Sequence, residues 1–308
     1  EQQELLNIVI VGGGATGIEV AGILSEMKKF VLPNDYPDMP SSLMHIYLIE
    51  AGPRLLAGMS EESSAHAEQF LREMGVNILL NKRVVDYRDH KVVLEDGTEI
   101  ATRTFIWVSG VTGVTIGNLD ASLIGRGGRI KVDSFNRVEG MNNVFAIGDQ
   151  CIQLADENYP NGHPQLAQVA IQQGELLAKN LIRMEKGQEM KPFHYRNLGS
   201  MATVGRNRAV AEFSKVKMQG WFAWVMWLVV HLRSILGVRN KVIVLLNWIW
   251  NYFTYDQSMR MIVYARKAKE IRDREKLEET NHWGKELIQE PKQHSPQEIQ
   301  QASGQEKK

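Results

Sequence analysis

The segment that most constrains the fold of this chain is a glycine-rich turn that follows an apolar run, Ile8–Val11. Gly12, Gly14 and Gly17 have the spacing G-x-G-x-x-G, and a helical pattern follows them. Such glycines permit a tight turn, a close approach of the backbone to a pyrophosphate and close packing of the helix on the strand. The N-terminus of the helix then faces the negative charge of the phosphates. Because the motif stands between a predicted strand and a predicted helix, it favours dinucleotide binding over a chance glycine turn.

The first 112 residues alternate between short apolar runs and helical patterns. The predicted helices are about Gly17–Lys28 and Ser60–Met74, and the further predicted strands are Met44–Ile49, Val76–Leu80, Val84–Tyr87, Lys91–Leu94 and Phe105–Ser109. Pro33, Pro37 and Pro40 argue against a continuous helix after Lys28. This alternation is typical of an α/β fold built from βαβ units. We therefore expect residues 1–112 to form a Rossmann-like NAD(H)-binding domain.

Two acidic residues stand where a bound dinucleotide would use them. Glu50 ends the second predicted strand, where a carboxylate commonly binds the adenosine ribose hydroxyls. It would repel a 2′-phosphate and favour NADH over NADPH, although Arg54 could accept that phosphate; an ordinary exposed strand-end Glu is the alternative. Glu19 lies in the first turns of the helix, where the helix dipole favours a carboxylate for structural reasons alone. A position beside the nicotinamide is an equally good interpretation of Glu19.

The composition excludes several classes of protein. The 308 residues suffice for about two domains, and a net charge of zero gives no overall field that would favour nucleic acid. The single cysteine, Cys151, excludes a disulfide framework, a thiolate metal cluster and a two-cysteine redox pair within this chain. The sequence predicts no metal site.

In residues 113–216 the sequence pattern differs from that of the first 112 residues. The run Val144–Ile147 is predicted to be a buried strand that ends in Gly148 and Asp149. A carboxylate at a strand end can accept hydrogen bonds from two hydroxyls of a ligand, although a simple turn is the more common meaning of Gly-Asp. A helix is predicted over about Gln165–Met184, followed by strand-like runs over Asn197–Glu212.

Five of the seven tryptophans of the chain cluster near its C-terminal end: Trp221, Trp224, Trp227, Trp248 and Trp250. The two most apolar stretches, Trp221–Val230 and Val242–Phe253, are too short to span a hydrocarbon core of about 30 Å. Tryptophan prefers the headgroup level, and interleaved Arg and Lys suit anionic lipid. Residues 217–266 are therefore predicted to form an amphipathic helical anchor in the plane of a lipid bilayer surface. Buried core helices and a homodimer interface are the alternatives, and residues 267–308 are predicted to be a disordered tail.

Five motifs that occur in order along the chain resemble those of one family. They are Gly13–Glu19 (GGATGIE), Trp107–Val111 (WVSGV), Ala146–Asp149 (AIGD), Ala167–Gly174 (AQVAIQQG) and Gly199–Gly205 (GSMATVG). Together with the aromatic C-terminal segment they resemble the type II NADH:quinone oxidoreductases. These are single-subunit, non-proton-pumping respiratory dehydrogenases among the flavoprotein reductases that bind two dinucleotides. The resemblance covers roughly residues 5–266.

The resemblance implies a Rossmann-like NAD-binding domain inserted in an FAD-binding domain, here incomplete, followed by the membrane anchor. Residues 113–216 would then be the later part of the FAD-binding domain. The implied reaction takes two electrons from NADH through FAD to a membrane quinone, ubiquinone or menaquinone. The implied location is peripheral, on the cytoplasmic face of the bacterial inner membrane.

The resemblance also implies roles for individual residues. NADH would be bound by Gly12, Gly14, Gly17, Glu19, Glu50 and Gly110; FAD by Gly148, Asp149, Ala167 and Gln168; and the quinone by Gln168, Gln172 and Arg206. Glu19, Gln168 and Gln172 would be the catalytic residues. A neutral amide suits a quinone carbonyl because it donates a hydrogen bond without burying a charge. The spacing of the two glutamines alone is as compatible with an exposed helix face.

One departure from the family pattern affects the cofactor. The family has an earlier glycine-rich motif that binds the ADP part of FAD, whereas this sequence contains only the later one. We therefore expect these residues alone to bind NADH, to hold FAD poorly and to be inactive by themselves. The alternatives are a related flavoprotein reductase with another acceptor, of the sulfide:quinone or ferredoxin type, and a non-catalytic NAD-binding membrane module. The sulfide branch needs reactive cysteines, and this chain has only Cys151.

Overall fold

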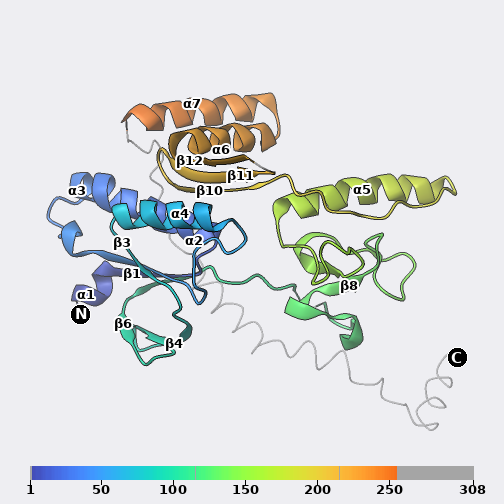
Figure 1. The fold of residues 1–308 in the computed structure, drawn as a ribbon, viewed down its shortest axis with the longest axis horizontal. Helices are drawn as coiled ribbons and strands as arrows, with labels where there is room; N and C mark the ends of the chain where they lie inside the picture. The colour runs from blue at the N-terminus through green and yellow to red at the C-terminus, as the bar shows by residue number, and fades with distance from the viewer. Residues whose placement is uncertain (1, 115, 215, 255–308) are drawn as a thin grey trace, which may run out of the picture. The chain divides into compact units, whose positions relative to one another are not determined.

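The computed structural model describes residues 2–114, 116–214 and 216–254, which are drawn in colour in Figure 1. The last part of the predicted anchor, residues 255–266, and the predicted tail, residues 267–308, lie outside the described residues.

A four-stranded parallel sheet forms the centre of the N-terminal part. Its strands are β1 (Asn7–Val11), β2 (His45–Ile49), β3 (Val76–Leu79) and β7 (Thr104–Trp107), in the order β3-β2-β1-β7. Every residue of β1 is buried: the strand has a neighbour on both sides, Ile8 and Ile10 pack in the core on one face of the sheet, and Val9 and Val11 pack in the core on the other. The strand order reverses between β1 and β7, and the carboxyl ends at such a point form the crevice in which open α/β sheets bind ligands. The predicted α/β fold with a parallel sheet is therefore confirmed.

The helices of this part pack around the sheet. They are α1 (Gln2–Leu6), α2 (Ala15–Glu26), the π-helical turn η1 (Met27–Val31), α3 (Leu32–Asp35), the short η2 (Ser41–Leu43) and α4 (Glu61–Glu73). The predicted end of the first helix near Lys28 is wrong, because the chain stays helical to Asp35. Pro33 lies in the first turn of α3, where its missing N–H breaks no helical bond. Ser60 is the N-cap of α4 as predicted, and its hydroxyl accepts from the backbone N–H of Ser63.

Between β3 and β7 the chain forms a small antiparallel sheet of β4 (Val84–Arg88), β5 (Lys91–Leu94) and β6 (Glu99–Ala101). The first two strands are predicted from the sequence, and β6 is not.

The next part contains two short parallel strands and a long helix. Its elements are η3 (Ala121–Leu123), η4 (Arg126–Gly128), β8 (Ile130–Val132), η5 (Gly148–Gln150), β9 (Cys151–Gln153) and α5 (Ala167–Glu185). The predicted strand Val144–Ile147 is wrong: Phe145 makes an isolated bridge to Arg137, and Val144 is 47% exposed. The partner of this run is the short turn that follows β8, which offers too few N–H and C=O groups for a ladder. Pairing resumes at β9, which lies parallel to β8.

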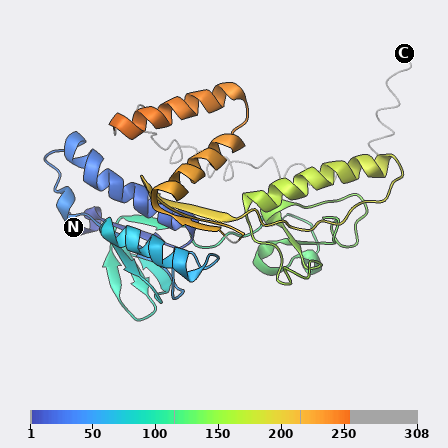
Figure 2. The same cartoon turned by 45° about the horizontal axis from the view of Figure 1, so that its top comes forward.

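A second antiparallel sheet follows, consisting of β10 (Ser200–Gly205), β11 (Arg208–Phe213) and β12 (Val216–Gln219), and it leads into helices α6 (Gly220–Ser234) and α7 (Val238–Thr254). Side chains alternate between the two faces of a strand. Ala202, Val204 and Val210 accordingly pack into the core of the N-terminal part. Ala209 and Ala211 pack on the other face, against Ala223 of α6. Figure 2 shows this sheet between the two C-terminal helices and the N-terminal part.

Helix α2 packs against β10 through a glycine. A Cβ atom at position 22 would lie 2.0 Å from the carbonyl oxygen of Val204. Alanine is a better helix former than glycine by about 1 kcal/mol, so destabilisation by Gly22→Ala would have to arise from this contact. We expect Gly22→Ala to lower the free energy of unfolding by about 1–3 kcal/mol, measured by urea unfolding.

The matched control is Gly58→Ala, because a Cβ atom there meets nothing within 4 Å. This variant should stay within about 0.5 kcal/mol of the parent protein. Equal stability of the Gly22→Ala variant and the parent would contradict the close packing of α2 on β10.

Candidate functional site

The glycine-rich turn has the geometry that a pyrophosphate requires. Gly12 turns with a φ of +118°, and its N–H donates to the carbonyl oxygen of Ile49 over 2.9 Å. A Cβ atom at position 17 would lie 1.8 Å from the carbonyl oxygen of Gly12, so α2 can approach the turn only with glycine there. A Cβ atom on Gly14 would meet nothing within 4 Å, so the backbone is open to a ligand at the start of α2. The three glycines thus serve the turn, the close packing and the close approach, respectively.

Glu50 binds the same turn directly. Its carboxylate accepts from the backbone N–H of Gly13 over 2.6 Å and from that of Gly52 over 2.7 Å. The side chain is half-buried rather than a freely exposed strand end. Arg54 turns to its own loop, where its guanidinium donates to the carbonyl oxygens of Met59 (2.7 Å) and Ala57 (3.0 Å).

Gly110 also reaches this site, from the loop after β7. The strand ends at Trp107, two residues earlier than predicted, so Ser109 and Gly110 belong to the loop. A Cβ atom on Gly12 would lie 3.0 Å from the backbone N of Ser109. The carboxyl ends of β1, β2 and β7 thereby bring together all the predicted NADH-binding glycines and Glu50.

Glu19 is half-buried in the second turn of α2, where the helix packs against β10. Its carboxylate accepts from the backbone N–H of Thr203 over 3.5 Å. Burial raises the pKa of Glu19, and the hydrogen bonds from Thr203 and the nearby His231 only partly offset this effect. A carboxyl group that titrates above its ordinary range can hold or release a proton near the dinucleotide turn.

A second cradle lies at the start of α5. Gly148 turns with a φ of +65°, and a Cβ atom there would lie 3.2 Å from the Cβ of Ala170. Asp149 is exposed beside this first turn of α5, and its carbonyl oxygen accepts from Gln165 over 3.1 Å. The backbone N–H groups of Val169 and Ala170 donate to the carbonyl oxygen of Leu166, whereas those of Ala167 and Gln168, at the start of the helix, have no acceptor within it. A carboxylate and unpaired N–H groups on one edge fit a ligand that carries hydroxyls and phosphate, such as FAD.

Sequence reasoning missed Gln173, which holds this cradle in shape. Its Oε1 accepts from the backbone N–H of Gly148 over 2.7 Å, and the residue is 1% exposed. The helical period could have revealed it, because Val169, Gln173 and Asn180 form the buried stripe of α5.

Gln168 and Gln172 bind the backbone that leads into β10. Gln168 donates to the carbonyl oxygen of Gly199 over 3.1 Å and accepts from the N–H of Leu198 over 3.0 Å. Gln172 donates to and accepts from Arg196 over 2.9 Å and 3.1 Å, respectively. Each amide group retains a second N–H that can donate to a ligand.

Arg206 does not join these glutamines. It lies at the far end of β10, about 20 Å along the strand from the segment that they bind. Its guanidinium donates to the carbonyl oxygens of Asn251 and Tyr252 over 2.9 Å and 3.1 Å, and lies over the Tyr252 ring. The structure therefore places Arg206 at the C-terminal end of α7.

The five clustered tryptophans fall into two groups. Trp221 and Trp250 are exposed, at 49% and 58%. Trp224 packs on Tyr252, and Trp227 packs on Trp248, so these three tryptophans lie between the two helices. All the residues of α7 are at least partly exposed, and most of its large apolar side chains are 41–78% exposed. Among the described helices, none combines the length and the apolar character needed to cross a bilayer.

Comparison with known proteins gives two family matches. The pyridine nucleotide-disulphide oxidoreductase family matches residues 1–174, and the NDH2 C-terminal domain matches residues 197–255.

Curated relatives agree with these matches. The chain is 35% identical over 261 residues to the type II NADH:quinone oxidoreductase NdhA of Mycobacterium tuberculosis, covering 80% of this chain and 54% of that protein. It is 32% identical to an internal alternative NAD(P)H-ubiquinone oxidoreductase of Arabidopsis thaliana, covering 82% of this chain and 52% of that protein. The chain thus spans about half the length of the curated relatives it matches.

Among solved structures, the fold resembles that of NDH2 from Plasmodium falciparum in complex with NADH. The TM-score is 0.75 at 20% identity, and the match covers 84% of this chain and 68% of that one. Glycine turn, sheet order and family matches agree: the chain belongs to the pyridine nucleotide-disulphide oxidoreductase family and, within it, to the type II NADH:quinone oxidoreductases.

Proposed function

We propose that this protein takes two electrons from NADH and passes them, by way of FAD, to a membrane quinone without pumping protons. The observation that carries the proposal is the dinucleotide turn at the end of β1, with the Glu50 carboxylate bound to Gly13. Family membership supports the acceptor, because the curated relatives are named as quinone oxidoreductases.

The NADH site that we propose uses the carboxyl ends of β1, β2 and β7. The pyrophosphate lies over Gly12 and Gly14, at the N-terminus of α2, where N–H groups and the helix dipole favour an anion. Glu50 accepts from the adenosine ribose hydroxyls and repels a 2′-phosphate. Arg54 does not offset this selectivity, because its guanidinium is occupied by carbonyl groups of its own loop. Glu19 lies further along α2, toward the nicotinamide.

Gly148, Asp149, Ala167 and Gln168 would hold FAD, with Gln173 fixing the turn at Gly148. When bound, the flavin supplies the chemistry of accepting a hydride and releasing two electrons. The protein orients the two ligands and supplies protons, for which Glu19 is the candidate because burial raises its pKa. On the quinone side, Gln168 and Gln172 each offer their second amide N–H to a quinone carbonyl. Arg206 supports this side indirectly, by holding the end of α7.

We propose the same division of the chain as the sequence predicts. Residues 1–112 bind NADH, residues 113–216 contribute to the FAD and quinone sites, and residues 217–266 lie on the bilayer surface. The exposed apolar side chains of α7 would enter the headgroup region, which lets the protein reach a lipid-dissolved quinone. The cytoplasmic face of a bacterial inner membrane is the proposed location.

A sulfide-oxidising relative fits the described residues less well. Cys151 is 4% exposed, and burial raises the pKa of its thiol. A reactive cysteine needs an accessible thiolate of lowered pKa. The quinone reductase remains the better proposal.

The first test distinguishes the binding of the protein to the membrane from its reduction of a quinone. Leu246 and Trp250 are 60% and 58% exposed and lie one turn apart on α7. With the protein in membranes of its own cell, NADH should reduce both a short-chain quinone in solution and a long-chain quinone in the bilayer. Leu246→Glu with Trp250→Glu should shift the protein out of the membrane fraction about tenfold and abolish only the reaction with the long-chain quinone.

Val85→Glu is the matched control, because Val85 is an apolar residue of β4 with 55% exposure. It should change neither membrane binding nor either reaction. The absence of NADH-dependent reduction of any quinone by the parent protein in membranes of its own cell would refute the proposed function. Unchanged membrane binding of the α7 variant would refute the anchor.

The second test addresses the selectivity of the NADH site. Glu50→Ala removes the acceptor of Gly13 and the proposed partner of the ribose hydroxyls. We expect it to weaken NADH binding about tenfold or more and to reduce the preference over NADPH, measured by equilibrium dialysis of both nucleotides. Glu61→Ala, on the exposed side of α4, should leave both unchanged. An unaltered NADH preference in the Glu50 variant would refute the assignment.

The third test uses the raised pKa of Glu19. The unfolded chain ionises this carboxyl at its ordinary pKa, near 4, whereas the folded protein ionises it at higher pH. Folding therefore favours the protonated form, and this contribution to stability is lost as the pH rises through the raised pKa. We expect Glu19→Gln to be more stable than the parent at pH 8, as measured by urea unfolding. The difference should shrink as the pH falls through the raised pKa and should vanish at about pH 4, where folded and unfolded chains both hold the proton.

The same Glu19→Gln variant should lose NADH-dependent quinone reduction. A buried carboxylate that lowers the stability of the fold at neutral pH indicates a functional role for that residue. Glu175→Gln, an exposed carboxylate of α5, should alter neither stability nor activity. A Glu19→Gln variant with full activity would assign this carboxylate a structural role alone.

A further inference from the structure

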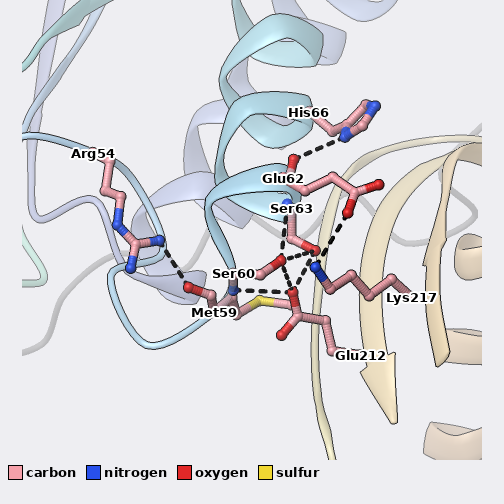
Figure 3. Close-up of polar contacts among 8 residues, drawn as sticks. All are labelled: Arg54, Met59, Ser60, Glu62, Ser63, His66, Glu212 and Lys217. Carbon is pink, nitrogen blue, oxygen red and sulfur yellow. Dashed lines mark hydrogen bonds and ion pairs between the residues drawn. The ribbon is translucent and has the colours of Figure 1, made fainter. Parts of the chain in front are cut away.

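The first turn of α4 is held by a carboxylate from a distant strand. Glu212 lies on β11, and its Oε1 accepts from the backbone N–H of Ser60 over 3.0 Å and from the hydroxyl of Ser63 over 2.6 Å. The hydroxyl of Ser60 donates to the same oxygen. Figure 3 shows these three hydrogen bonds converging on Glu212. The carboxylate therefore caps the N-terminus of α4 from outside the helix.

The charge of Glu212 suits this position. A helix N-terminus presents unpaired N–H groups and a positive partial charge, both of which favour an anion. Burial raises the pKa of Glu212, but the hydrogen bonds from Ser60 and Ser63 outweigh burial and leave the pKa below its ordinary value. The folded protein therefore keeps Glu212 ionised at neutral pH.

The first turn of α4 is in turn bonded to the dinucleotide turn. The hydroxyl of Ser64 donates to the carbonyl oxygen of Leu55 over 2.6 Å. The next residue, Leu56, donates its N–H to the carbonyl oxygen of Gly13 over 2.8 Å. The middle of the loop of residues 51–59 is thus bonded both to Gly13, through Leu56, and to α4, through Leu55. Glu50 immediately precedes this loop.

Strand β11 carries this connection to the C-terminal helices. Val210, on the same face of the strand as Glu212, packs into the core of the N-terminal part, whereas Ala211 packs on α6. Strand β11 therefore contacts both α4, next to the proposed NADH site, and α6, next to the proposed membrane surface.

We propose that Glu212 is a positioning residue for NADH. It fixes the first turn of α4, and through this turn it holds the loop of residues 51–59 in the conformation that binds the adenosine half of the dinucleotide. Glu212 does not touch the nucleotide itself. The inference rests on the proposed NADH site, and it adds a residue from the C-terminal sheet to the determinants of NADH affinity.

The same interface supplies a matched control. Lys217 forms an ion pair with Glu62 of α4 over 3.1 Å, but the two side chains are 46% and 61% exposed. Exposed pairs of this kind contribute little. Lys217→Gln should therefore leave the loop in place, although it removes a contact between α4 and β12, the neighbour of β11 in the same sheet.

The experiment measures nucleotide affinity by equilibrium dialysis. Glu212→Ala should weaken NADH binding about fivefold, a typical effect for a residue that acts on a site without touching the ligand. Glu212→Gln keeps an acceptor but loses the charge, and it should restore part of the affinity. Lys217→Gln should stay within about twofold of the parent. In the Glu212→Ala background, Ser63→Ala should add no further loss, because the Ser63 hydroxyl donates to Glu212 and the two side chains act as one unit.

Fragments of the nucleotide separate positioning from a general loss of stability. The Glu212→Ala variant should lose affinity for ADP-ribose by the same factor as for NADH, with no change in affinity for nicotinamide mononucleotide. Parent-like NADH affinity in a folded Glu212→Ala variant, or an equal loss for both fragments, would overturn the proposal. A parent protein that binds no NADH would instead refute the NADH site itself.

Discussion

Two close approaches of helix α2 determine how the rest of the structure is arranged. At Gly17 the helix lies against the carbonyl oxygen of Gly12, and at Gly22 it lies against that of Val204 on β10. The two glycines are five residues apart, so they point to different sides of the helix, about 140° apart. Glycine at these two positions therefore lets the backbone of α2 approach the dinucleotide turn on one side and the C-terminal sheet on the other.

Contacts between successive elements connect the proposed donor site with the proposed acceptor site. The start of α2 faces the pyrophosphate, Glu19 follows in the next turn beside β10, and β10 begins at the segment that Gln168 and Gln172 hold. Helix α6 covers the outer face of the same sheet, and α7 presents its apolar side chains outward. Packed elements thus connect the proposed nucleotide site with the proposed quinone site and the proposed membrane surface.

The sequence predicts those features that depend on neighbouring residues. The glycine spacing, the Ser60 cap and the alternation of strands and helices are local patterns, and the structure has them. The strand at Val144–Ile147 fails because an apolar run needs a partner, and its partner is only a short turn. The part of the site that depends on distant residues could not be predicted. Glu212 reaches Ser60 across 152 positions, and nothing in the sequence near either residue indicates the other.

The most direct test of this account is an experimental structure of the protein with NADH bound. We expect the pyrophosphate over the backbone of Gly12 and Gly14, the adenosine ribose hydroxyls on Glu50, and the nicotinamide on the side of Glu19. Density for NADH at any other place, or a ribose that leaves Glu50 bound only to Gly13 and Gly52, would contradict it.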